Sequence, residues 1–91
     1  MTPEELLRRY PRETLRWLRG RLGLTQLNLA LELGTDVASV SRWETDRIPI
    51  GPRNRARLAA LLTPQLATDA GTAFLATLDG GGEPWPTTPT A

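Results

Sequence analysis

Residues 25–44, TQLNLALELGTDVASVSRWE, decide the fold of this chain of 91 residues. Leucines alternate through residues 27–33, a pattern that taken alone is typical of a half-buried strand. The flanking residues favour a helix instead, because Thr25 is a good N-cap and Gly34 stands where a C-capping glycine belongs. Leucine and alanine are also strong helix formers, and no β-branched residue interrupts the run. We therefore expect a helix over residues 26–33.

A second helix is expected directly after Gly34. Asp36 can cap it, and Val40 and Trp43 lie three residues apart on one face of residues 36–44. Only three or four residues separate the two expected helices, which is the length of a tight turn that usually contains a glycine. The pattern predicts two short helices that meet at a steep angle.

The chain before this pair also carries helical signals. Thr2 and Pro3 suit the start of a helix that reaches about Tyr10, and Pro11 opens a second run with leucines on one face, which ends at Gly23. A proline disfavours helical geometry at the residue before it. One kinked helix and two separate helices both fit this pattern.

The chain after the pair continues with helix-forming sequence. Pro52 can begin a helix whose apolar face consists of leucines within residues 58–62. Apolar residues at intervals of four then predict one more helix over residues 64–78, although Gly71 weakens it. These apolar residues are Leu66, Ala70, Phe74 and Leu78.

The predicted fold class is all-α, a compact bundle of four to six short helices with a flexible C-terminal tail. The tail is predicted from residue 79 onward, because glycines and prolines replace packing residues there and too little apolar area is left to offset the entropy of ordering. Four segments are expected: a helical extension at 1–13, a central helical domain at 14–63, an extra helix or dimerisation segment at 64–78 and a disordered tail at 79–91.

Length and composition argue against several classes of protein. A chain of 91 residues holds one small domain with little room for a buried catalytic pocket. It has no cysteine and no histidine, so disulfides, the usual zinc sites and histidine-based catalysis lack their residues. We expect no enzyme, no cofactor and no metal. No stretch has the length and apolarity of a membrane span and the start lacks signal-peptide features, so the expected location is the cytoplasm, without membrane contact.

The charge is unevenly distributed along the chain. All eleven basic residues are arginines within residues 1–62, where seven acids leave a net charge of +4, whereas residues 63–91 hold three acids and no base. Arginine suits bidentate contacts with phosphate and guanine, but its exclusive use also fits an arginine-rich genome. The body of the protein is therefore basic and its C-terminal part acidic.

The residues that stand out together match one known motif over about half the chain. In order they are Leu15, Leu18, Arg19, Leu22, Gly23-Leu24-Thr25-Gln26, Leu29-Ala30, Leu33-Gly34, Val40-Ser41-Arg42-Trp43-Glu44, Pro49, and Leu58 to Leu62. This set resembles the Cro/repressor, or xenobiotic-response-element, type of helix-turn-helix DNA-binding protein. The resemblance implies a transcription regulator, repressor-like, that binds an inverted repeat of double-stranded DNA as a homodimer and is associated with the nucleoid when bound.

The resemblance also implies which residues read the bases. The second helix of the motif enters the major groove with its first residues, which here selects Val37, Ala38, Ser39 and Arg42. The two apolar residues can pack on thymine methyl groups, and Arg42 fits guanine O6 and N7. Asp36 would be repelled by phosphates, so capping the helix is favoured over accepting a hydrogen bond from cytosine.

A second set of residues is expected to contact phosphates. Gln26 can offer its backbone N–H and its side-chain amide, with an exposed polar helix residue as the alternative interpretation. The arginines of the set are alternatively a solvated basic face. Thr45 and Asp46 replace the glycine-containing turn that many relatives place after the glutamate, so the resemblance does not specify the geometry of this loop. The phosphate set is Thr25, Gln26, Ser41, Thr45, Arg47 and Arg53.

Two further features follow from the match. Family members commonly pair the residues that correspond to Arg19 and Glu44, so we expect a structural salt bridge between them. Leu27 and Leu31 replace polar, solvent-facing residues, and we expect the N-terminal extension to cover them, with a protein partner or second subunit as the alternative.

The competing functional hypothesis is a protein-interaction module, such as an antitoxin or phage-type regulator that acts mainly through a partner protein. Its partner would engage the face of Leu27 and Leu31 or the C-terminal tail, and Phe74 is a further candidate interface residue, within the 64–78 segment.

Overall fold

The computed structural model describes residues 1–79, and these residues form six helices and no strand. The all-α prediction is therefore confirmed. The tail predicted for 79–91 lies outside the described residues except for Asp79, which ends the last helix. The helices are α1 (Pro3–Arg9), α2 (Pro11–Leu22), α3 (Gln26–Leu33), α4 (Val37–Glu44), α5 (Pro52–Leu66) and α6 (Asp69–Asp79).

The first two segments are separate helices rather than one kinked helix. Thr2 caps α1 by accepting a hydrogen bond from Glu5 N at 3.1 Å, and Tyr10 leaves helical geometry with φ −131° and ψ 60°. Pro11 then lies in the first turn of α2. Backbone N–H groups in that turn have no acceptor within the helix, so a proline there costs no hydrogen bond.

The pair α3 and α4 has the bounds that its caps predict. Thr25 Oγ1 accepts from Asn28 N at 3.0 Å at the start of α3, and Asp36 Oδ1 accepts from Ser39 N at 3.2 Å at the start of α4. Between them Gly34 takes a left-handed φ of 69°, a conformation that glycine adopts without a steric penalty. The observed α4 begins one residue later than the helix predicted over 36–44, because Asp36 is its cap and not its first residue.

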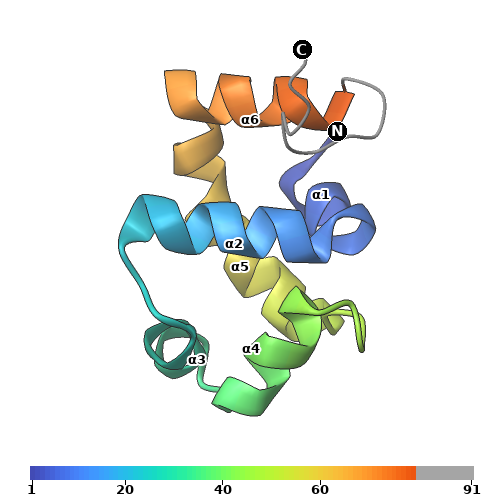
Figure 1. Ribbon diagram of the computed structural model, residues 1–91, viewed down its shortest axis with the longest axis vertical. Helices are drawn as coiled ribbons and strands as arrows, with labels where there is room; N and C mark the ends of the chain where they lie inside the picture. Colours follow the sequence, from blue (N-terminus) through green and yellow to red (C-terminus); the bar gives the residue numbers. More distant parts are fainter. Residues whose placement is uncertain (80–91) are drawn as a thin grey trace.

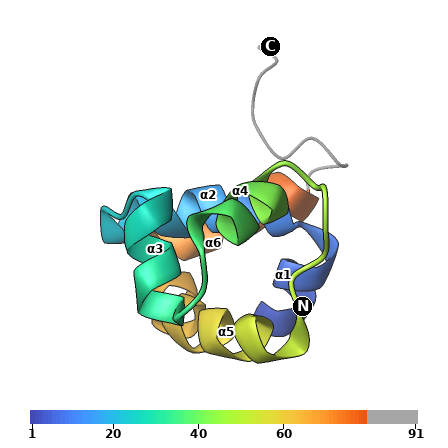
Figure 2. The ribbon, with the colours of Figure 1, turned by 90° about the horizontal axis from the view of Figure 1, so that it is seen from below.

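The helices surround one hydrophobic core. In Figure 1, α2 crosses the middle of the molecule, with α6 on one side of it and the α3–α4 pair on the other. Figure 2, seen from below, shows α5 across from α4, so that the core lies between them. Fully buried leucines and one valine from five helices meet there: Leu6, Leu7, Leu15, Leu18, Leu29, Val40, Leu58 and Leu62.

Helix α1 belongs to this core and does not cover α3. Leu6 and Leu7 are 0% exposed, and α1 packs against α5 and α2. Leu27 and Leu31 remain 54% and 68% exposed. The expectation that the N-terminal extension covers them was wrong. Both leucines of α1 are buried in the core, where α1 packs against α2 and α5 and not against α3.

The last helix begins later than predicted. Pro64 lies inside α5, which continues to Leu66, and α6 starts at Asp69. Thr68 separates the two helices, since its Oγ1 accepts from Gly71 N at 3.0 Å. Any side chain at position 71 would overlap the backbone of Leu66, so Gly71 permits this close approach.

Phe74 fastens α6 to the rest of the molecule. Its ring stacks on Trp17 of α2 with centroids 4.6 Å apart and planes 8° apart, and it is only 3% exposed. The expectation that Phe74 is an interface residue is therefore corrected: it is a core residue of the single chain.

No helix among residues 1–79 has the length and apolarity needed to cross a membrane.

Candidate nucleic-acid interface

Glu44, the last residue of α4, is buried and held by an arginine from another helix. Its side chain is 1% exposed, and Arg19 of α2 donates to both carboxylate oxygens, Nε to Oε2 at 2.5 Å and Nη2 to Oε1 at 2.8 Å. The hydrogen bond to Glu44 raises the pKa of Arg19 above its ordinary value. The structure thus brings together the two residues expected to form a salt bridge, and this bidentate contact fixes the end of α4 against α2.

Two more side chains reach the same carboxylate. Gln26 Nε2 donates to Glu44 Oε1 at 3.1 Å, and Arg16 Nε lies 3.8 Å from that oxygen. Sequence reasoning missed both contacts. The spacing of Arg16 and Arg19, three residues apart on one helix face, is a signal that could have indicated the Arg16 contact, whereas nothing in the sequence pointed to the Gln26 contact. Glu44 therefore connects α2, α3 and α4.

The contact with Glu44 changes what Gln26 offers. Its side-chain amide is engaged within the protein, while its backbone N–H, in the first turn of α3, has no acceptor inside the helix. The backbone group is thus the part of Gln26 that stays open to an external acceptor.

The opposite end of α4 is exposed. Asp36 and Val37 are exposed, Val37 by 42%, and Ala38 and Ser39 are half-buried. Hydrogen bonds from Ser39 hold the pKa of the Asp36 carboxyl below its ordinary value. The carboxylate of Asp36 is therefore occupied as the helix cap, the role favoured for it over base contact.

An open depression lies on the outer side of α4 and the loop after it. Its lining combines small, hydroxyl-bearing and basic side chains: Ala38, Ser41, Arg42, Thr45 and Arg47. Thr45 Oγ1 donates to Ser41 O at 2.9 Å, which holds the threonine against the end of the helix. Of the residues expected to read bases or contact phosphates, these five come together, whereas the other five lie outside the depression: Thr25, Gln26, Val37, Ser39 and Arg53.

The arginines divide into paired and free ones. Six have a carboxylate oxygen within 4.0 Å, and Arg21 and Arg57 donate to the oxygens of Gln65 and Leu33. Within residues 1–79, the remaining side chains have neither an ion-pair partner nor a hydrogen-bond acceptor. They are Arg42, Arg47 and Arg53, all exposed, on α4, on the following loop and in the first turn of α5.

The loop after α4 takes the backbone geometry of a glycine turn without a glycine. Asp46 has a φ of 58°, and Arg47 N donates to Arg42 O at 2.8 Å. Aspartate tolerates the left-handed region better than most residues, but at some cost. Asp46 thus holds a conformation that glycine adopts without a steric penalty.

Comparison with known proteins identifies the same part of the chain. A family model described as helix-turn-helix matches residues 15–63, which is more than half of the sequence and runs from α2 to α5. Searches of curated proteins and of solved structures give no significant match. Helices α1 and α6 lie outside the matched segment.

Proposed function

Because the chain belongs to the Cro/repressor type of helix-turn-helix proteins, a family of DNA-binding regulators, we propose that it represses transcription by binding a specific sequence of double-stranded DNA with α4 in the major groove. Residues 14–63 are the DNA-binding domain in this proposal. Regulation follows from occupation of the DNA site, and no catalytic step is involved.

The distribution of unpaired arginines supports this orientation most directly. Of the three arginines without an acceptor among residues 1–79, two line the depression beside α4 and the third lies in the first turn of α5, on a chain with a net charge of only +1. Charge that the protein does not neutralise is available to DNA phosphates, whose neutralisation provides much of the affinity of such complexes. The three arginines are Arg42, Arg47 and Arg53.

Base reading is assigned to the exposed start of α4. Val37 and Ala38 pack on thymine methyl groups, Ser39 contacts a base edge with its hydroxyl, and Arg42 donates to guanine O6 and N7. Since only Arg42 is a strong polar reader, phosphate contacts and DNA shape supply much of the affinity.

Phosphate binding is assigned to two places on either side of the reading residues. At the start of α3, the backbone N–H of Gln26 and the hydroxyl of Thr25 approach one strand. Along the depression, the hydroxyl of Ser41 and the guanidinium of Arg47 approach the other, with Arg53 beyond them. The hydroxyl of Thr45 joins them by exchanging its hydrogen bond to Ser41 O for one to a phosphate.

A homodimer on an inverted repeat, with half-sites about one helical turn apart, completes the proposal. Phe74 and Leu78 are buried within one chain, so a contact through α6 uses its exposed residues, Thr72, Ala73 and Ala76.

Selection of bound duplexes from a random pool tests this function. A recovered palindromic motif supports both specific binding and dimerisation, whereas recovery of unrelated duplexes contradicts the proposal. With the selected duplex, fluorescence anisotropy at several salt concentrations then separates two roles. Arg47→Ala should weaken binding to all sequences and lower the salt slope by about one unit, and Arg42→Ala should also relax the sequence preference by about 1–3 kcal/mol. An unchanged slope for Arg47→Ala contradicts its phosphate contact.

The exposed leucines of α3 support a second candidate function. Leu27 and Leu31 form an apolar pair at 54% and 68% exposure, four residues apart, on a helix face that no other part of residues 1–79 covers. A protein-interaction module would use this face for its partner. Competition with shuffled duplexes discriminates, because such a module shows only weak, salt-sensitive DNA binding without sequence preference.

A further inference from the structure

Arg16 carries a positive charge that the protein positions but does not neutralise. Glu44 is already bound by Arg19 through both oxygens, at 2.5 Å and 2.8 Å. Arg16 approaches the same carboxylate only through Nε, at 3.8 Å from Oε1, and its side chain remains 53% exposed. One carboxylate therefore faces two guanidinium groups, and one unit of positive charge is left over at the surface of α2.

The position of this charge is set by Glu44 Oε1. Gln26 Nε2 and Arg16 Nε lie 3.1 Å and 3.8 Å from that one oxygen, so the two side chains are neighbours although α2 and α3 carry them. The Nη groups of Arg16 have no acceptor among residues 1–79. Arg16 is thus a neighbour of the residue that begins α3 and whose backbone N–H has no acceptor inside the helix.

We propose that Arg16 is a further DNA-phosphate contact, held beside Gln26 by Glu44 and directed at the same strand. This inference rests on the proposed DNA binding. Glu44 is then a positioning residue: it fixes the end of α4 through Arg19, the start of α3 through Gln26 and the phosphate-binding cation through Arg16. Arg16 does not read bases, since a phosphate contact is independent of sequence.

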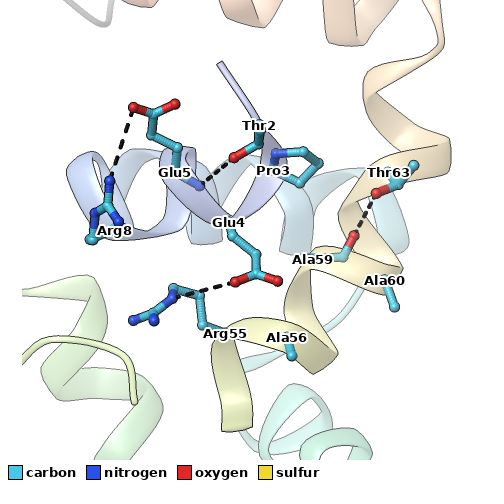
Figure 3. A pocket seen from close by; sticks show the side chains of 10 residues that line it. All are labelled: Thr2, Pro3, Glu4, Glu5, Arg8, Arg55, Ala56, Ala59, Ala60 and Thr63. Carbon is cyan, nitrogen blue, oxygen red and sulfur yellow. Dashed lines mark hydrogen bonds and ion pairs between the residues drawn. The ribbon is translucent and has the colours of Figure 1, made fainter. Parts of the chain in front are cut away.

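The chain offers a matched control at Arg8. Arg8 and Arg9 share the carboxylate of Glu5, at 4.0 Å and 3.9 Å, so one unit of positive charge is left over on α1 as well. Figure 3 shows Arg8 with Glu5 on α1, beside the groove that α1 forms with α5, where Arg55 reaches Glu4. The Arg8→Gln and Arg16→Gln variants thus change the net charge equally, but at different places on the surface.

The test measures binding of the full chain to a fluorescent duplex at salt concentrations from 50 to 200 mM, with the selected sequence and with a shuffled one. Arg16→Gln should lower the slope of log Kobs against log salt by about 0.9, so that its affinity difference from the unmodified chain shrinks about threefold across this range. Both duplexes should lose affinity equally. Arg16→Lys should restore the slope, because an ammonium also neutralises a phosphate.

Several results would overturn the inference. An unchanged slope for Arg16→Gln excludes the phosphate contact, and an equal drop for Arg8→Gln shows that only net charge matters. If Arg47→Ala lowers the slope and Arg16→Gln does not, DNA binding stands and the inference on Arg16 alone fails. If the unmodified chain binds no duplex, the proposed function fails and this inference with it. Circular dichroism should show the same melting temperature for Arg16→Gln, since the side chain is exposed.

Discussion

The two ends of α4 are built differently. At its start Val37 is exposed, the next two residues are half-buried, and one local cap holds the backbone, the contact of Asp36 with Ser39. The last residue, Glu44, is buried and connected to two other helices. The helix is thus anchored at the end that contacts the protein, while the end proposed to read bases depends on its own backbone and leaves its side chains free.

Removing the contact between Arg19 and Glu44 should cause the largest change in stability. Arg19→Met leaves the Glu44 carboxylate, 1% exposed, without its bidentate partner, and we expect a loss of about 3 kcal/mol in the free energy of unfolding. The value lies at the lower end for buried pairs because Arg19 is itself 23% exposed. Urea denaturation measures it. The double variant Arg19→Met/Glu44→Leu should lose less than Arg19→Met alone, and a larger loss for the double variant would contradict a buried unpaired charge as the cause.

A glycine in the turn after α4 should change the stability by an intermediate amount, and it should raise it. Asp46 holds a left-handed φ of 58°, so Asp46→Gly should stabilise the fold by about 1 kcal/mol. The exposed ion pair of Asp46 with Arg12, at 4.0 Å, contributes little and its loss does not cancel the gain. Thermal melting measures the change. Asp46→Ala, which also lacks the carboxylate but keeps a Cβ, should be no more stable than the unmodified chain; equal gains for both variants would rule out backbone strain.

The smallest change in stability is expected from the cap at the start of α4, and this change depends on pH. Ser39 lowers the pKa of Asp36 in the folded state. The cap therefore contributes stability above the pKa of the unfolded carboxyl and loses it as the pH falls through the lowered folded value. Asp36→Asn keeps a capping side chain without titration, so it should be slightly less stable than the unmodified chain at pH 7, and the difference should be smaller near pH 3, below the ordinary pKa of the carboxyl. Melting curves at both pH values test this, and a constant difference would contradict it.

The sequence predicted the local structure well because caps carry that information. The alternating leucines of 27–33 could not distinguish strand from helix, but Thr25 and Gly34 did, and both have the capping geometry expected of them. The resemblance to a known motif likewise predicts the Arg19–Glu44 contact.

The errors concern how helices pack on one another. Which helix α1 covers depends on where Leu6 and Leu7 find space, and no periodicity within 1–13 specifies that neighbour. The meeting of Gln26 and Arg16 at one oxygen likewise requires the crossing of three helices. Pro64 predicts a boundary between two helices, because a proline removes one backbone hydrogen bond of a helix. Helix α5 tolerates that loss near its end and continues to Leu66.

The burial of Leu6 and Leu7 has a consequence for how the molecule opens. A helix of seven residues is far too short to persist in water alone, so α1 exists only while its two leucines remain in the shared core. Removing α1 would in turn uncover the leucines of α2 and α5 that it contacts. The N-terminal helix and the DNA-binding segment therefore form one cooperative unit, and amide hydrogens of α1 should exchange with solvent mainly when the whole core unfolds, not by fraying from the chain end.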